Sequence, residues 1–170
     1  MNESSRKHLS DWLRDAHAME VQADKMLRDQ ASRLEHYPEL QSRIEKHIQE
    51  TQGQLEKLES VIDKADMDTS AFKDIGAKFA AMGQSMGGMF VSDEVVKGGI
   101  ASLSFEHFEI ANYKALISAA EYCGELEVKR VCEEILKEEE NMAQWLEENL
   151  PAVTQAFLAR SSEDDVPAKR

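Results

Sequence analysis

Four long stretches of the chain carry apolar residues at intervals of three and four, the spacing of one face of an α-helix. The stretches run from Ser5 to Glu35, from Pro38 to Ala65, from Ser92 or Asp93 to Tyr122, and from Glu125 to Asn149. The 170 residues include only three prolines and eight glycines, and no run alternates with the period of two that indicates a strand. Because a helix with one apolar face must bury it against another element, the pattern predicts an all-α fold, an antiparallel four-helix bundle.

The lengths of the connections predict how these helices are arranged. Only a short break at His36–Pro38 separates the first two helices, so they should be antiparallel neighbours. The next connection, residues 66–92, has 27 residues and four glycines. It is long enough to cross a helix of roughly 42 Å even if residues 72–86 form a short helix. We therefore expect a long crossover that makes the second and third helices parallel.

Gly124 and Pro151 are the expected ends of the last two long helices. A short C-terminal helix over residues 153–158 should follow Pro151, and the polar residues 161–170 should form a frayed tail. The expected organisation is thus one bundle over residues 1–160 and a tail over residues 161–170.

The formal net charge of −13 argues against several classes of partner. A nucleic-acid-binding protein needs a basic surface to neutralise phosphates, and this sequence has no basic stripe. Anionic membranes are disfavoured for the same reason, and no uncharged run approaches the ~18 residues that span a bilayer. Residues 1–10 lack the apolar core of a signal peptide, so a cytoplasmic protein is expected. Cys123 and Cys132 match no redox or zinc motif and are expected to be reduced.

Each predicted helix has a glutamate on or beside its inward face. In the third helix Glu106 falls within the apolar stripe, and Glu109 lies along its edge. The others are Glu20 in the first helix, Glu50 in the second and Glu139 in the fourth. Burial of a carboxylate is costly unless it is paired or bound to a metal, and two cations could compensate such a group of carboxylates. A partner lysine or arginine for Glu20, and a solvated helix edge for Glu50, are the alternatives.

A weak internal repeat relates the two helical hairpins. At an offset of 89 residues Glu20 matches Glu109, and Glu50 matches Glu139. Two glutamates in register at one offset are typical of a bundle with two similar hairpins around a central site.

Several segments resemble known families of helical metalloproteins. Residues 135–146, ILKEEENMAQWL, look like the fourth-helix segment of bacterioferritins, and residues 105–113, FEHFEIANY, are similar to the third-helix segment of rubrerythrins. The segments DWLRDAHAME, YPEL, ET and SDEVVKG, which begin at residues 11, 37, 50 and 92, resemble the bacterial ferritin-like YciE/YciF stress-protein family. The resemblance covers residues 10–160 and implies a ferritin-like fold, a homodimer and a dinuclear metal centre.

In such a centre the expected metal ligands would be Glu20, Glu50, Glu106, Glu109 and Glu139, with iron as the expected metal and manganese or zinc as alternatives. Ferritin-like sites usually place a histidine three residues after the glutamate of the second and fourth helices. Gly53 and Met142 occupy those positions here. The site could therefore be all carboxylate or could take His47 or His107, and a role for Glu138 stays open. Tyr113, one turn beyond Glu109, could donate to a ligand carboxylate.

Three functions agree with these observations. The first is a stress-associated protein whose dinuclear centre has ferroxidase or peroxidase-type activity. The second is a non-enzymatic, stress-induced dimer with a degenerate metal site, which the missing histidines favour. The third is an iron-storage cage, which the lack of a clear fifth helix makes less favourable.

Overall fold

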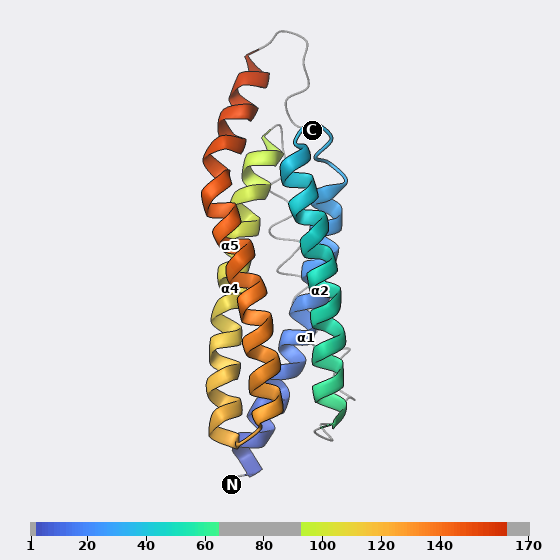
Figure 1. The fold of residues 1–170 in the computed structure, drawn as a ribbon, viewed down its shortest axis with the longest axis vertical. Helices are drawn as coiled ribbons and strands as arrows, with labels where there is room; N and C mark the ends of the chain where they lie inside the picture. The colour runs from blue at the N-terminus through green and yellow to red at the C-terminus, as the bar shows by residue number, and fades with distance from the viewer. Residues whose placement is uncertain (1–2, 65–92, 163–170) are drawn as a thin grey trace.

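The computed structural model describes residues 3–64 and 93–162. These residues form four long helices, α1 (Glu3–Ala31), α2 (Pro38–Lys64), α4 (Glu94–Cys123) and α5 (Leu126–Ser161), and contain no strand (Figure 1). The all-α prediction is therefore confirmed. The predicted short helix over residues 72–86 and the predicted tail beyond residue 162 lie outside the described residues.

The helices form a bundle of two antiparallel hairpins, α1–α2 and α4–α5 (Figure 1). Helix α1 packs against α2 and α4, and α5 packs against α2 and α4, so α1 and α5 lie diagonally opposite each other. Helices α2 and α4 run in the same direction (Figure 1). The two ends of the connection between them consequently lie at opposite ends of the bundle, as the predicted crossover requires.

The turns follow the local sequence closely. Helix α1 ends at Ala31, four residues earlier than expected, because Leu34 and Tyr37 turn inward and are buried. At the other hairpin Gly124 adopts φ 71°, a left-handed conformation in which glycine has no steric cost. Its amide donates to the Glu121 carbonyl at 3.1 Å and ends α4 as predicted.

The prediction that Pro151 ends the last helix is wrong, since α5 continues through it to Ser161. A proline removes one helical hydrogen bond to the carbonyl four residues earlier, that of Glu147. Both Pro151 and Glu147 are exposed, so water can satisfy that carbonyl. Val153 and Phe157 then pack against the core and carry the apolar face of α5 onward. The expected separate C-terminal helix is thus the last part of α5.

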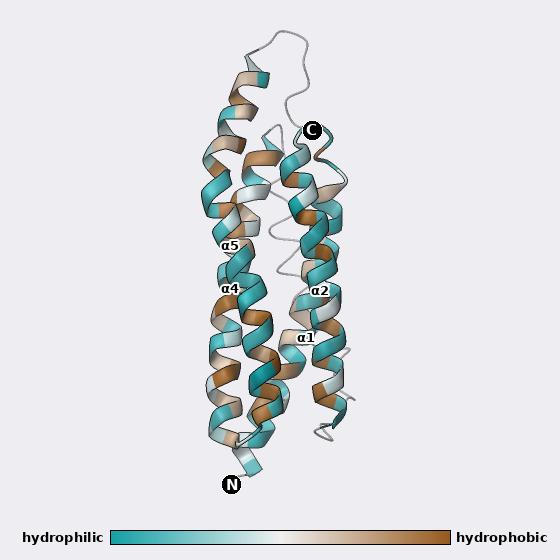
Figure 2. Ribbon diagram, viewed as in Figure 1, coloured by the Kyte–Doolittle hydropathy of each residue, from teal (hydrophilic) through white to brown (hydrophobic). Residues whose placement is uncertain are grey.

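The core consists of two apolar clusters, one at each end of the bundle. The lower cluster, toward the α4–α5 turn, includes Leu13 and Ile135, and the upper cluster, toward the α1–α2 turn, includes Ile44 and Met142. Every helix carries both hydrophobic and hydrophilic residues along its length (Figure 2). No helix in the described ranges is long and apolar enough to cross a membrane. Between the two clusters lies a layer of buried polar side chains.

Candidate metal centre

The buried polar layer contains four of the five predicted glutamates. Four glutamates are each at most 2% exposed: Glu20, Glu106, Glu109 and Glu139. Glu139 lies on α5 between Ile135 of the lower cluster and Met142 of the upper cluster, and the other three lie on their helices next to residues of the lower cluster. Four carboxylic acids are therefore removed from water at one level of the bundle.

His47 of α2 completes this layer and is 1% exposed. Its Nε2 atom lies 3.3 Å from Glu106 Oε2 and 3.4 Å from Glu139 Oε2. Ligand atoms of these three residues all lie within 4.8 Å of one another, close enough to share one metal ion. An imidazole with two carboxylates is a donor set that suits iron, zinc or manganese.

Glu20 and Glu109 form the other half of the layer. Tyr113, which is fully buried, donates a hydrogen bond of 2.5 Å from Oη to Glu20 Oε1. The sequence allowed either such a contact or an ordinary half-buried tyrosine at this position, and the structure shows the contact.

Several buried acceptor atoms in the layer receive no hydrogen bond from the described residues. They are Glu20 Oε2, Gln54 Oε1 and Glu109 Oε1, together with Glu106 Oε2 and Glu139 Oε2, which lie in ion-pair range of His47 Nε2 but outside hydrogen-bond geometry. Buried acceptors without a donor are rare because each costs about 1–3 kcal/mol. Oxygen atoms that lack donors but lie together are what hard and borderline cations require, so these residues fit a metal centre.

Burial and mutual repulsion favour protonation of three carboxyl groups, those of Glu20, Glu106 and Glu109, in the absence of metal. Burial raises the pKa of Glu106 to about 7, even though His47 opposes the rise. Burial, and then the charges of neighbouring glutamates, raise the pKa values of Glu20 and Glu109 well above the ordinary 4.5. Burial lowers the pKa of His47, but the charge of Glu106 and contacts with Glu139 and Glu50 outweigh it and raise the pKa well above 6.5. The layer must therefore hold either protons or metal cations.

Glu50, the fifth predicted ligand, lies outside this group. Its Oε2 atom is 2.9 Å from His47 Nδ1 and 3.2 Å from Arg43 Nη1, and its Oε1 atom is 3.2 Å from Lys46 Nζ. Burial raises the pKa of Glu50, but these three partners outweigh it and lower the pKa to about 2. The carboxylate is thus ionised and already has donors on both oxygens.

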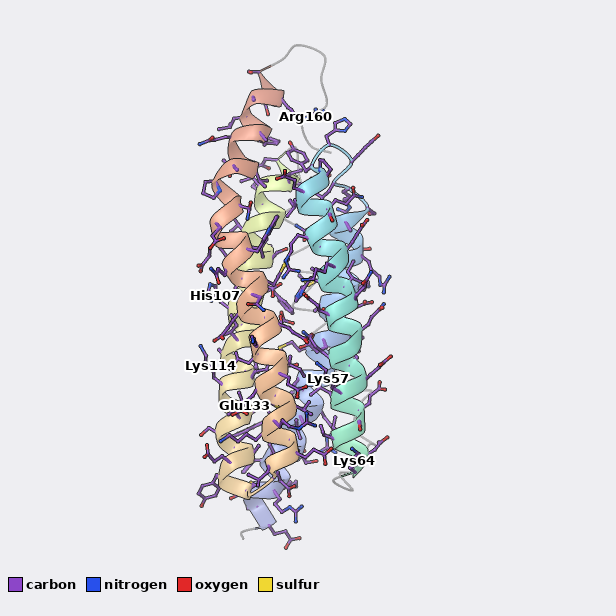
Figure 3. All side chains as sticks on the ribbon, in the orientation of Figure 1. Lys57, Lys64, His107, Lys114, Glu133 and Arg160 are labelled. Carbon is purple, nitrogen blue, oxygen red and sulfur yellow. The ribbon has the colours of Figure 1, made fainter. Side chains whose placement is uncertain are left out.

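The remaining candidates lie farther out. His107, on the outer side of α4, pairs at 2.9 Å with Glu147, and its side chain is 54% exposed (Figure 3). Glu138 is half-buried and accepts hydrogen bonds from Gln54 and from Lys57, which Figure 3 labels. Of the two histidines that the sequence left open, the structure brings only His47 to the layer.

Gly53 and Met142, at the positions where a ferritin-like site would carry histidine, contribute no ligand. Met142 is fully buried in the upper apolar cluster. A Cβ atom at Gly53 would meet nothing within 4 Å. His47 instead comes from the turn of α2 that precedes Glu50, and its position on the inward flank of that helix was the signal in the sequence.

Gln54 supports the layer from α2. It is fully buried, and its Nε2 atom donates to Glu139 Oε1 at 2.5 Å and to Glu138 Oε2 at 2.9 Å. One amide therefore holds both a carboxylate of the layer and its more exposed neighbour. His47, Glu50 and Gln54 are spaced by three and four residues, so all three lie on one flank of α2.

Most of the chain matches a known family. A family model described as "Domain of unknown function (DUF892)" matches residues 4–159. A protein of Xanthomonas campestris pv. campestris, solved by crystallography, is 41% identical over 94% of this chain and 99% of its own, with a TM-score of 0.79. The crystal structure of the E. coli stress protein YciF matches at 21% identity over 88% of this chain and 96% of its own, with a TM-score of 0.77.

YcfI from Rhodopseudomonas palustris is a further structural neighbour, at 26% identity over 84% of this chain and 92% of its own, with a TM-score of 0.69. These likenesses confirm the predicted bundle. With the family model, they show that the chain belongs to the DUF892 family, in agreement with the predicted YciE/YciF type.

Proposed function

We propose that this protein holds a dinuclear metal centre in the buried polar layer, with iron as the metal and manganese or zinc as alternatives. The residues that would hold it are Glu20, His47, Glu106, Glu109 and Glu139. The observation that carries the proposal is the set of buried carboxylate oxygens without a donor among the described residues. Glu50, the remaining predicted ligand, is not in this set, because donors already contact both oxygens of its carboxylate.

The arrangement suggests a division of the layer into two parts. His47, Glu106 and Glu139 offer nitrogen and oxygen donors within 4.8 Å of one another. Glu20 and Glu109 offer carboxylate oxygens, and Tyr113 holds Glu20 through one of its two oxygens. Two metal ions would satisfy all four carboxylates, which a single ion could do less well.

Bound ferrous iron would supply reducing equivalents for oxygen or peroxide, which is ferroxidase or peroxidase-type chemistry. The chain's own contribution is to exclude bulk water with the two apolar clusters and to fix the donor atoms on rigid helices. His47 and the carboxyl groups would release their protons as a cation enters. A stress-associated role is proposed because a structural neighbour is the E. coli stress protein YciF. A cytoplasmic location is proposed as well, and a homodimer is proposed from the family resemblance.

The second candidate is a non-enzymatic protein with a degenerate metal site. The observation in its favour is that the layer contains a single imidazole, whereas Gly53 and Met142 occupy the positions of the usual histidines. In that case the layer would remain protonated and metal would add nothing to stability.

Elemental analysis of protein purified without chelators or metal-affinity columns tests the proposal directly. We expect close to two metal ions per chain after anaerobic loading with ferrous iron, and an absorbing ferric species when oxygen is added. A matched pair of variants, Glu106→Gln and Glu147→Gln, separates the layer from the surface, because the Glu147 side chain is 54% exposed and pairs with the equally exposed His107. Loss of iron in the first variant alone is expected. Equal iron in both would contradict the proposal, and equal melting temperatures with and without metal would favour the second candidate.

A further inference from the structure

Glu50 differs from the other four glutamates in the partners of its carboxylate. The side chain of Glu50 is 21% exposed, and both its oxygens face cationic or hydrogen-bonding groups from its own helix. The other four are buried, and each has an oxygen without a donor among the described residues. A metal ligand must have a lone pair available, so Glu50 is the least suited of the five.

Contacts of Glu50 with His47 define the orientation of the imidazole ring. A carboxylate only accepts hydrogen bonds, so the ring nitrogen that faces Glu50, Nδ1 at 2.9 Å, must carry a proton. The opposite nitrogen, Nε2, then faces Glu106 and Glu139. In metal sites, a ligating histidine usually donates its second ring N–H to a carboxylate or carbonyl, which fixes the tautomer and the ring plane. The Glu50–His47 contact has this geometry.

Two cations in turn hold Glu50 where it is. Arg43, whose side chain is only 10% exposed, contacts the same oxygen as His47, and Lys46 contacts the other oxygen. Withdrawal of Glu50 toward the layer would break three contacts and leave the guanidinium of Arg43 partly buried without its partner, which is costly. The hydroxyl of Thr51 adds support by donating at 3.0 Å to the His47 carbonyl.

From these contacts we infer that Glu50 is a positioning residue outside the metal ligands, which holds His47 with Nδ1 protonated and Nε2 directed to the metal. The inference rests on the proposed metal centre and deepens it. With this assignment α2 contributes one ligand to the centre, the imidazole of His47, whereas a ferritin-like pattern would also take a glutamate from this helix.

The test compares metal stoichiometry with metal affinity. Cobalt(II) titrations followed by calorimetry and visible absorption would be made on the wild type, Glu50→Ala, Glu50→Gln and Glu106→Gln. We expect Glu50→Ala to bind the same number of cobalt ions as the wild type, but with an affinity about 10–100-fold lower, the usual effect of losing such a supporting carboxylate. Glu50→Gln should lose less, because its amide oxygen can still accept from Nδ1–H. Glu106→Gln, which removes a ligand, should lower the stoichiometry.

Lys64→Gln serves as the surface control on the same helix, because the Lys64 side chain is 62% exposed and pairs with Glu127 rather than with a residue of the layer. Nitrogen-15 NMR of the zinc-loaded protein, labelled at histidine, reports the tautomer independently of folding yield. We expect a protonated Nδ1 and a metal-bound Nε2 at His47. A stoichiometry in Glu50→Ala as low as in Glu106→Gln, or a His47 ring bound through Nδ1, would overturn the inference. Wild-type protein that binds no cobalt or zinc would instead refute the proposed metal centre itself.

Discussion

The metal-free protein should become less stable as the pH rises from about 4.5 to about 7. Glu106 has a pKa of about 7 in the folded protein, compared with 4.5 for an unperturbed glutamate. Between these values the folded state retains a proton that the unfolded chain releases, so the free energy of unfolding falls with increasing pH. At about 1.4 kcal/mol per pKa unit, this one carboxyl group accounts for about 3 kcal/mol. The change belongs to the whole cluster, because Glu106 interacts with Glu139 and His47.

His47 acts in the same direction at higher pH. Its pKa is raised well above 6.5 in the folded protein, so its stabilising charge is fully present below 6.5 and is lost as the pH rises through the folded-state value. Glu50 acts on the acidic side. Its pKa of about 2 gives stability that is present above 4.5 and is lost as the pH falls toward 2. The metal-free protein should therefore be most stable near pH 4.5 to 5.

Bound metal should reverse this dependence above pH 5. A metal ion requires deprotonated ligands, so its affinity, and hence its stabilising effect, rises as protons leave the layer. Urea unfolding at half-unit pH intervals from 3 to 8, with and without a chelator, measures both slopes. Glu106→Gln is the matched control, since an amide cannot ionise; without metal, it should be more stable than the wild type at pH 7.5. A metal-free wild type whose stability is constant or rises from pH 5 to 7 would refute the electrostatic argument.

The remaining predictions concern four single substitutions. Tyr113→Phe removes the donor to Glu20 and should lower the free energy of unfolding of the metal-free protein by about 1–3 kcal/mol, as measured in urea. A loss smaller than that caused by the same tyrosine-to-phenylalanine change at an exposed position would contradict the contact. Gly53→Ala should stabilise α2 by about 0.5–1 kcal/mol with unchanged metal stoichiometry, because the added methyl group meets nothing within 4 Å. Gly99→Ala should gain less than this, since its Cβ would lie 2.8 Å from a Leu150 side-chain carbon, and an equal gain at both glycines would show that the space makes no difference. Pro151→Ala should raise the melting temperature, as it restores a helical hydrogen bond within α5, and a lower melting temperature would mean that Pro151 packs favourably.

The helices and their arrangement could be predicted because spacing and connection length are local properties of the sequence. The end of α5 could not, because the local effect of Pro151 is opposed by the tertiary packing of Val153 and Phe157. The interrupted apolar stripes predicted how many helices meet at the layer and identified four of its carboxylates. The role of each residue within the layer could not be predicted, because the pattern of one helix does not give the distances between side chains of different helices.

Glu50 shows most clearly where the sequence pattern is insufficient. The repeat at an offset of 89 residues makes Glu50 equivalent to Glu139, yet only Glu139 is buried in the layer. Residues around the two glutamates explain the difference. Arg43, Lys46 and His47 of α2 correspond in the repeat to Cys132, Ile135 and Leu136 of α5. The cationic groups that hold Glu50 outward thus have apolar counterparts in α5. A comparison of the glutamates alone does not include this difference between their neighbours.

The buried polar layer also determines how the four helices can be aligned along the bundle axis. If α5 slid by one helical turn, Glu139 would move to the level of apolar side chains, and either Ile135 or Ala143 would take its place beside His47. A uniformly apolar interior would tolerate such a slip at modest cost, whereas here every slipped arrangement leaves a carboxyl group without polar neighbours. The acidic side chains thereby specify one vertical alignment of the bundle, whether or not they also strengthen it.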